Sequence, residues 1–254
     1  MLADPSAGPN LATTQILADP TGILTPLHQA VAADYPRRRW IQARCEAEKT
    51  DAEKSLAAMR KAATAEDRMN SVREFLGAVS GLLAVAQLKR PTTRRTLALL
   101  RELLEAQGRP DLNEAALAVM GSAHMSRADV EALLDRTMMA FDRAAEVNQT
   151  PIPYGFAIRA HIRPYYVDGT LEMFDEGSHR EAVFWLACLD TIYFVLQNDA
   201  PESEKPGFAS DFQAMYASLG FTSAERWGER VDTAARLAPE IYTIAAALVA
   251  RHPE

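Results

Sequence analysis

Side chains able to bind a ligand are concentrated between residues 148 and 180. Three prolines and three glycines interrupt "NQTPIPYGFAIRAHIRPYYVDGTLEMFDEG" (residues 148–177), so no regular periodicity runs through it. Polar and aromatic side chains on such segments contact ligands more often than those on regular helices. The arginines and tyrosines suit a small polar or anionic molecule. A simple joint between two helical subdomains is the alternative. The expected ligand-binding residues are Tyr154, Arg159, His161, Arg163, Tyr165, Tyr166, Asp168, His179 and Arg180.

Two patterns suggest metal chemistry, but a structural explanation fits each better. His161 and His179 have acidic neighbours, yet no spacing such as HExxH places them on one helical face. In "GSAHMSRADVE" (residues 121–131) a Gly-Ser pair precedes Asp129 and Glu131, as before the metal-binding carboxylates of nucleotidyltransferases. These acids fall in the first turn of an expected helix, where carboxylates favour the positive end of the dipole. We therefore expect no metal site and no cofactor.

Catalytic residues are not indicated by any complete motif. The sequence has no GxSxG elbow, P-loop or GxGxxG, and no nucleophile stands at a recognised distance from a base. Glu181 follows Ser178 by three residues, which is the spacing of a capping box at the start of a helix. Whether the protein is an enzyme is left open, and its catalytic residues are unknown.

The elements that must position these residues are helices. Residues 37–62 lack Gly and Pro and are rich in strong helix formers. Three-four spacing of apolar residues predicts further helices, one of them ending at Pro91 and another spanning residues 179–197. Helix starts are expected at Ser126, Ser178 and Thr222. The fold class is all-α, a bundle of about eight to ten helices. The apolar faces are Met69, Val72, Phe75, Leu76, Val79, Leu82, Leu83 and Ala86; Leu97, Leu100, Leu103 and Leu104; Val130, Leu133, Leu134, Met138, Phe141 and Ala145; and Ile241, Tyr242, Ala245, Leu248 and Val249.

The N-terminal stretch "QILADPTGILTPL" (residues 15–27) reads differently, as one short strand, a turn and a helix. A lone strand leaves backbone groups unpaired, so residues 14–19 should pair with a second copy or form a loop. Asp19, with Pro20 and Gly22, also suits the first position of a turn. We expect an extended segment or remnant strand over 1–21, a helical subdomain over 22–147, and a second one packed on it over 148–254.

Composition excludes several classes of protein. The formal charge of -7 lacks the basic excess that binding to nucleic acid requires. The two cysteines form no disulfide framework or zinc pattern. No apolar run approaches the roughly 20 residues of a membrane helix, and the N-terminus lacks the features of a secretory signal. We expect a cytoplasmic protein that binds neither nucleic acid nor membrane.

The segment "ILADPTGIL" (Ile16–Leu24) resembles one in bacterial nucleotidyltransferases of the aminoglycoside-adenylyltransferase superfamily. There, a strand and turn lead from the catalytic sheet into a helical C-terminal half that helps to form the acceptor-substrate site. The later "PRRRW", "REFLGAVSGLLAVAQLKRPTTRRTL" and "HREAVFWL" resemble that half in layout. The glycine-serine loop and two strand aspartates of that family should precede Ile16, and they are not found there. The resemblance therefore assigns no catalytic residue to this chain.

Three hypotheses about function follow, of which the last is a purely structural dimerisation protein. The first is a non-catalytic nucleotidyltransferase-like helical domain that binds a small molecule or a partner, such as the substrate half of a truncated or split enzyme. Its partner would be a second copy or a chain that supplies the sheet. The second is an independent helical enzyme that acts on a small polar or anionic metabolite through Arg163, Tyr165, Tyr166, His179 and Arg180.

Overall fold

The structure, a computed structural model, describes residues 2–4, 7–152 and 155–254. Within these ranges every regular element is a helix, and no strand is present, so the predicted all-α class is confirmed. The α-helices are α1 (Ala7–Thr13), α2 (Leu24–Asp34), α3 (Arg38–Met59), α4 (Ala65–Ala86), α5 (Thr96–Ala106), α6 (Pro110–Met120), α7 (Arg127–Val147), α8 (Arg163–Asp175), α9 (His179–Ala187), α10 (Asp190–Asp199), α11 (Lys205–Ser218) and α12 (Ala224–Val249), with short 3-10 helices η1 (Thr93–Arg95), η2 (Gly155–Ala157) and η3 (Ala160–Ile162).

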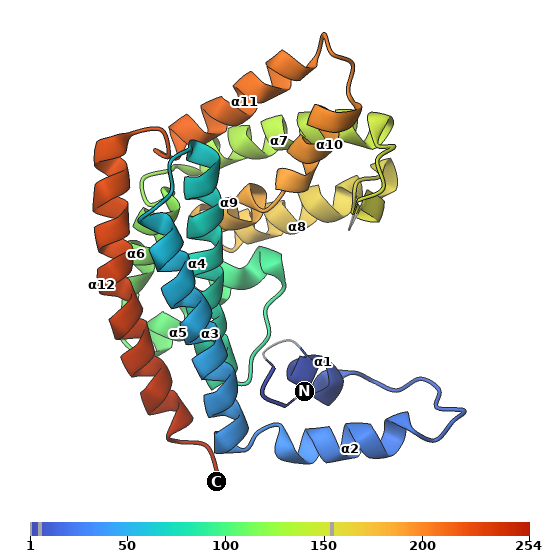
Figure 1. Cartoon of the computed structure of the whole chain (residues 1–254), viewed down its shortest axis with the longest axis vertical. Helices are drawn as coiled ribbons and strands as arrows, with labels where there is room; N and C mark the ends of the chain where they lie inside the picture. The colour runs from blue at the N-terminus through green and yellow to red at the C-terminus, as the bar shows by residue number, and fades with distance from the viewer. Residues whose placement is uncertain (1, 5–6, 153–154) are drawn as a thin grey trace.

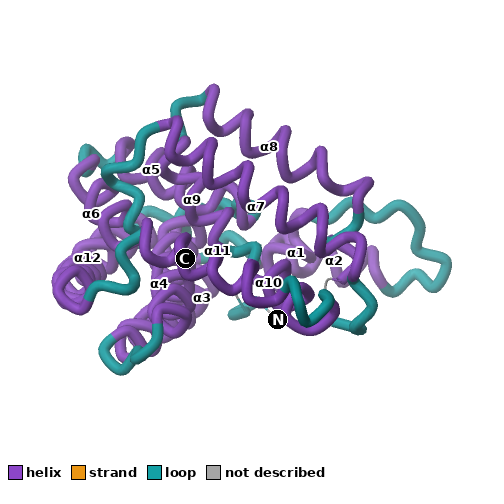
Figure 2. The backbone as a smooth tube through the Cα atoms, turned by 90° about the horizontal axis from the view of Figure 1, so that it is seen from above, coloured by secondary structure: helices purple, strands orange, loops and turns teal. Residues whose placement is uncertain are grey.

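Three long helices, α3, α4 and α12, pack side by side and form one part of the body (Figure 1). Helix α4 lies at their centre because its apolar residues cover more than one face, and Phe75, Leu76 and Val79 are fully buried. A second group of helices runs across this layer, and α7 and α8 lie alongside each other in Figure 2. One continuous core joins the helices up to α7 to those that follow it. The division into subdomains over 22–147 and 148–254 stays a prediction.

Helix starts follow the predicted chemistry at some positions and not at others. At Ser126 the capping box is confirmed, because Asp129 accepts a bond from the Ser126 amide at 2.8 Å and its own amide donates to the Ser126 hydroxyl. At α12 the capping side chain is Ser223, one residue later than the predicted Thr222, and its hydroxyl accepts from the Arg226 amide at 3.3 Å. The start of α12 is thus set by the residue whose side-chain oxygen accepts a hydrogen bond from an amide of the first turn.

The capping box predicted for Ser178 and Glu181 is wrong. Glu181 is 1% exposed, and its Oε1 accepts hydrogen bonds from Asn113 at 3.2 Å and from Arg101 at 3.5 Å. The Ser178 hydroxyl accepts from Arg101 at 2.9 Å instead of capping α9. The start of α9 lies against α5 and α6, so donors distant in sequence draw the carboxylate into the core. Glu181 therefore belongs to a buried structural network.

The continuous helix predicted over residues 179–197 is divided into α9 and α10. Helix α9 ends at Ala187 and α10 begins at Asp190, with Cys188 and Leu189 between them. Arg73 of α4 reaches this junction, where Nη1 donates to the Ala187 carbonyl at 3.1 Å and to the Asp190 carboxylate at 2.6 Å. These bonds satisfy a carbonyl that the break leaves without a helical partner. The helix predicted to end at Pro91 also ends earlier, at Ala86, and Leu88 has a positive φ of 54°.

The stretch over residues 148–177 is only partly irregular. After η2 and η3, residues 163–175 form the regular helix α8. Pro164 lies in its first turn, where a proline nitrogen loses no helical hydrogen bond. This proline therefore begins a helix that the punctuated pattern did not predict.

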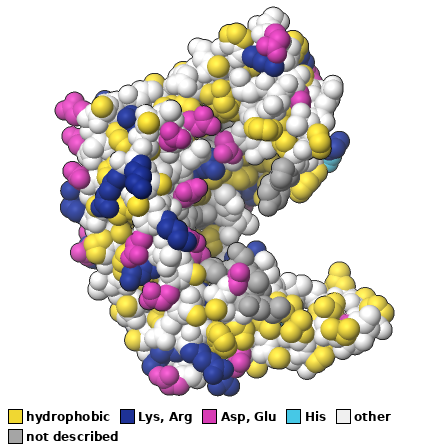
Figure 3. Space-filling model, viewed as in Figure 1, with side chains coloured by type: hydrophobic (Ala, Val, Ile, Leu, Met, Phe, Trp, Pro, Cys, Tyr) yellow, Lys and Arg dark blue, Asp and Glu magenta, His cyan; other side chains and the backbone are white. Residues whose placement is uncertain are grey.

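The N-terminal residues form an arm that projects from the body (Figures 1 and 3). Helices α1 and α2 pack on each other, and residues 14–23 between them form a loop in place of the remnant strand. Asp19 opens a turn there, since its carbonyl accepts from the Gly22 amide at 3.1 Å and its carboxylate from the Thr25 amide at 2.8 Å. The arm exposes several large apolar side chains, namely Leu17, Ile23, Leu24 and Leu27.

Crossing a lipid bilayer takes a long and apolar helix, and the described residues contain none.

Candidate functional site

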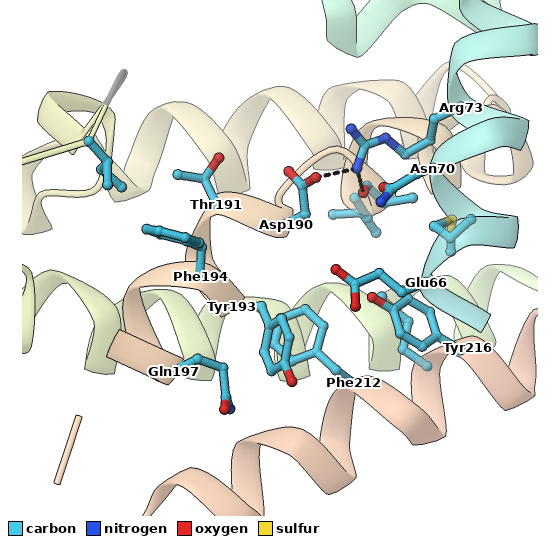
Figure 4. Close-up of a pocket in the computed structure, with 15 residues that line it drawn as sticks. Glu66, Asn70, Arg73, Asp190, Thr191, Tyr193, Phe194, Gln197, Phe212 and Tyr216 are labelled. Atoms are coloured by element: carbon cyan, nitrogen blue, oxygen red, sulfur yellow. Dashed lines mark hydrogen bonds and ion pairs between the residues drawn. The ribbon is translucent and has the colours of Figure 1, made fainter. Parts of the chain in front are cut away.

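A cleft of about 480 Å³ opens between α4, the α9–α10 junction and α11 (Figure 4). Its walls come from segments that lie far apart in the sequence. The residues lining it are Glu66, Met69, Asn70, Arg73, Ile152, Leu186, Ala187, Asp190, Thr191, Tyr193, Phe194, Gln197, Phe212, Met215 and Tyr216. The volume is within the range of small-molecule sites in proteins.

One end of the cleft is polar, and α4 supplies much of it. Glu66, Asn70 and Arg73 stand four and three residues apart, which places them on the same face of the helix. Arg73 is held in place by its bonds to the Ala187 carbonyl and the Asp190 carboxylate (Figure 4). The Asp190 side chain is therefore fixed at the first residue of α10 and lines the cleft.

Tyr216 of α11 lies beside Glu66 in the close-up view (Figure 4). Its ring is buried, and desolvation, with a smaller contribution from the negative charge of Glu66, raises the pKa of Tyr216 to about 12. The phenol therefore stays protonated at neutral pH. It can donate a hydrogen bond in the cleft and cannot serve there as a base.

Aromatic rings form the opposite end. The rings of Tyr193 and Phe212 lie with centroids 4.3 Å apart, tilted by 42°, so α10 and α11 contact each other through them. Phe194 also lines the cleft and is 48% exposed (Figure 4). Such rings provide apolar surface for a ligand body, and their faces attract cations.

Cys188 lies at the α9–α10 junction but is not an activated nucleophile. Desolvation raises the pKa of its thiol to about 11, in spite of the opposing effect of Arg73. The thiolate, which is the reactive species, is then scarce at neutral pH. In the described part of the chain, no group of three or more His, Cys, Asp or Glu side chains is arranged to hold a metal ion.

The ligand-binding residues predicted from the sequence lie elsewhere. Among the described ones, none lines this cleft, and Tyr154 falls outside the described residues. Those on the surface are Arg159, His161, Tyr165 and Asp168, whereas Arg163, His179 and Arg180 are half-buried. Their role as ligand contacts stays a prediction.

Several of these predicted residues have partners that account for their positions. Arg163 pairs with Asp142 at 2.6 Å, and Arg180 holds both carboxylate oxygens of Glu114 at 2.8 Å. Tyr166 is buried, and its ring stacks on Trp185 with centroids 5.5 Å apart. Its hydroxyl donates to the Ala157 carbonyl at 3.1 Å. Buried and bonded in this way, Tyr166 packs α8 against α9.

The sequence carried weak signals for the cleft. Asp190 interrupts the most apolar stretch of the chain, and Glu66, Asn70 and Arg73 repeat at helical spacing. Both patterns also occur on ordinary solvated helix faces, and only the packing of α11 against α4 and of α10 against α11 gives them a common opening.

The chain matches no protein-family model, no curated protein and no solved structure. The chemistry of the cleft must therefore be inferred from its own geometry.

Proposed function

We propose that the protein is a helical module that binds a small amine-bearing molecule in the cleft between α4, α10 and α11. The observation that carries the proposal is the combination of charge and shape in one opening. Two carboxylates, Glu66 and Asp190, stand against a single guanidinium, Arg73, and aromatic rings line the other end. A ligand with a positively charged amine and an apolar body would match both ends.

Glu66 is the carboxylate that is free to bind. It is exposed and forms no ion pair within the described ranges, whereas Asp190 is already bonded to Arg73. A charge-assisted hydrogen bond from an ammonium group to Glu66 would be the main polar contact. The hydroxyl of Tyr216 and the side chains of Asn70 and Thr191 offer further hydrogen bonds from the same walls.

The resemblance of residues 16–24 to nucleotidyltransferases supports a binding role. In that family the helical half helps to form the acceptor-substrate site, so a cleft between helices is where a substrate would sit. We propose on this basis that the chain acts as a binding domain of that kind. The purified chain should then release no pyrophosphate from nucleoside triphosphates and magnesium. Turnover would instead favour the alternative of an independent enzyme.

The cleft is tested by titrating the protein with benzylamine, benzyl alcohol and benzoate, three probes that share a ring and differ in charge. We expect benzylamine alone to bind saturably and to raise the melting temperature, because binding to the native state stabilises it. Glu66→Gln should weaken this binding at least about tenfold, since a hydrogen bond to a charged group contributes about 1.5–3 kcal/mol.

Glu225→Gln is the matched control. Glu225 is also an exposed acid at the second residue of a helix, α12, but it lies outside the cleft. Both variants lose the same favourable interaction with a helix dipole, so their melting temperatures should fall by similar small amounts. If benzoate binds as tightly as benzylamine, or if the two variants bind benzylamine equally, the proposal is wrong.

A partner on the N-terminal arm is a second part of the proposal, and we propose a second copy of the chain as that partner. The arm exposes Leu17, Ile23, Leu24 and Leu27, and a twofold contact would bury each set against the other. Sedimentation velocity should show a dimer that Leu17→Lys with Ile23→Lys converts to monomer. A wild-type chain that is monomeric at high concentration would contradict this part and leave the cleft proposal untouched.

A further inference from the structure

A second cavity, of about 340 Å³, lies between the end of α6, the turn after α11 and the first turns of α12. It is separate from the cleft, and its walls combine small residues with basic ones. The residues lining it are Ala118, Gly121, Ala123, His124, Leu219, Gly220, Arg226, Glu229, Arg230 and Thr233.

Arg230 is a buried cation without a counter-charge. Its side chain is 7% exposed, and no carboxylate of the described residues lies within ion-pair distance of it. Nη2 donates to the Leu219 carbonyl at 2.6 Å, and the Phe221 ring covers one face of the guanidinium at 4.1 Å. Nε and Nη1 have no hydrogen-bond partner. Burying a charge in this way is costly unless an opposite charge comes close.

Two glycines line the cavity beside the Nη2 edge of this guanidinium. A Cβ atom at Gly121 would lie 2.8 Å from Nη2, and one at Gly220 would lie 3.3 Å from it. A Cβ atom at Gly121 would also collide with the Leu219 carbonyl oxygen, which accepts from Nη2, whereas at Gly220 no other atom lies closer than Nη2 itself. The space beside Nη2 is therefore open on the Gly220 side. Gly121 and Gly220 have φ angles of 91° and 78°, a conformation that other residues rarely adopt.

A second cation stands beside the first. Arg226 precedes Arg230 by one helical turn, is exposed, and forms no ion pair in the described part of the chain. Desolvation, with the repulsion of Arg226 added, lowers the pKa of Arg230 to about 10, so Arg230 remains charged at neutral pH. His124 lines the same wall, and Glu229 is the single acid there. Two neighbouring cations facing one acid leave an excess of positive charge.

We propose that this cavity binds a small oxyanion, a phosphate or carboxylate group, between Arg226 and the Nη2 edge of Arg230. The anion would neutralise a charge that the fold buries alone, and the two arginines would provide charge-assisted hydrogen bonds to its oxygens. The bare backbone at Gly220 lets the anion approach Nη2. The site is spatially separate from the amine cleft, since the two share no lining residue.

The test is a titration of the full chain with inorganic phosphate and, separately, with acetate, at an ionic strength held constant with chloride. Binding is followed by calorimetry and by the NMR shifts of the Gly121 and Gly220 amides. We expect saturable binding with a dissociation constant of about 1 mM or tighter for at least one of the two anions. A preference for phosphate would identify a tetrahedral ligand group, and a preference for acetate would identify a carboxylate.

Arg226→Gln should weaken the preferred anion about tenfold or more. Arg251→Gln, an exposed position at the far end of α12, removes the same charge and should leave binding unchanged. Arg230→Met should abolish binding if the variant folds, and the Arg226→Gln result decides the question if it does not. The proposal is overturned if Arg226→Gln and Arg251→Gln weaken anion binding equally. It is also overturned if phosphate and acetate produce no larger response than chloride does.

Discussion

Replacing Glu48 with glutamine should stabilise the protein above neutral pH and change its stability little in acid. Glu48 lies on α3, and its carboxylate rests against α4 where Gly81 has no side chain; a Cβ atom there would lie 2.7 Å from Oε2. Asp51 and Glu74 line the same hollow, and Lys54, the nearby cation, pairs with Asp51 at 2.8 Å. The carboxylate of Glu48 is therefore desolvated without receiving a compensating charge.

The magnitude follows from linkage between protonation and folding. Desolvation, with repulsion from Asp51, raises the pKa of Glu48 from 4.5 to about 7. Between these values the native state holds more protons than the unfolded state, so the free energy of unfolding falls as the pH rises and the loss is complete above about pH 7. A rise of that size corresponds to about 3 kcal/mol. Because the Glu48 side chain is only half-buried, screening by solvent reduces the expected effect to about 1–2 kcal/mol.

Urea unfolding followed by far-ultraviolet circular dichroism measures this effect. Glu48→Gln should exceed the wild type by about 1–2 kcal/mol at about pH 8 and by a few tenths at about pH 5. Glu46→Gln, on the exposed side of the same helix, is the control and should show no such pH dependence. A pH-independent change in Glu48→Gln, or an NMR titration that places the midpoint of the Glu48 carboxyl near 4.5, would refute the reasoning.

Two further predictions concern Cys188, at the α9–α10 junction beside the cleft, and helix α11. Cys188 should resist alkylation in the native protein near neutral pH and react fully in urea, because desolvation raises the pKa of its thiol to about 11; rapid native labelling counted by mass spectrometry would contradict this. Amide hydrogen exchange should be faster in α11 than in α4, since Tyr216 is the one fully buried residue of α11 whereas most of α4 from Met69 to Ala86 is buried. If peptides from the two helices were equally protected from exchange, the few buried contacts of α11 would not determine its stability.

Local patterns predicted the fold class well because they depend on local physics. The apolar spacing from Met69 to Ala86 identifies the buried face of α4, and Ser126 with Asp129 marks the start of α7. The same spacing failed at Ser178 because Arg101 and Asn113, 80 and 68 residues before Glu181, supply the partners of its carboxylate. No pattern within one helix reports such a partner.

The candidate site was harder to predict for the same reason. Residues 148–180 offered the densest set of polar and aromatic side chains, yet the polar groups of the cleft come from α4, α10 and α11. Asp190 joins them because Arg73 reaches the junction between α9 and α10. That junction contains no glycine or proline, so no residue there predicts a division of the helix. Tertiary contacts, which local sequence propensities do not encode, therefore determine where the cleft forms.

Helix α11 connects the two proposed binding sites. Phe212, Met215 and Tyr216 line the amine cleft, and the turn that follows the helix contributes Leu219 and Gly220 to the oxyanion cavity. Since the helix itself fully buries little more than Tyr216, its position against α4 depends on few contacts. A ligand in either site would add contacts to α11, which has few of its own. Once one ligand has ordered this helix, the ligand of the other site no longer has to order it. The sparse packing of α11 thus gives the two sites, opposite in charge, a physical route to favour each other's occupancy.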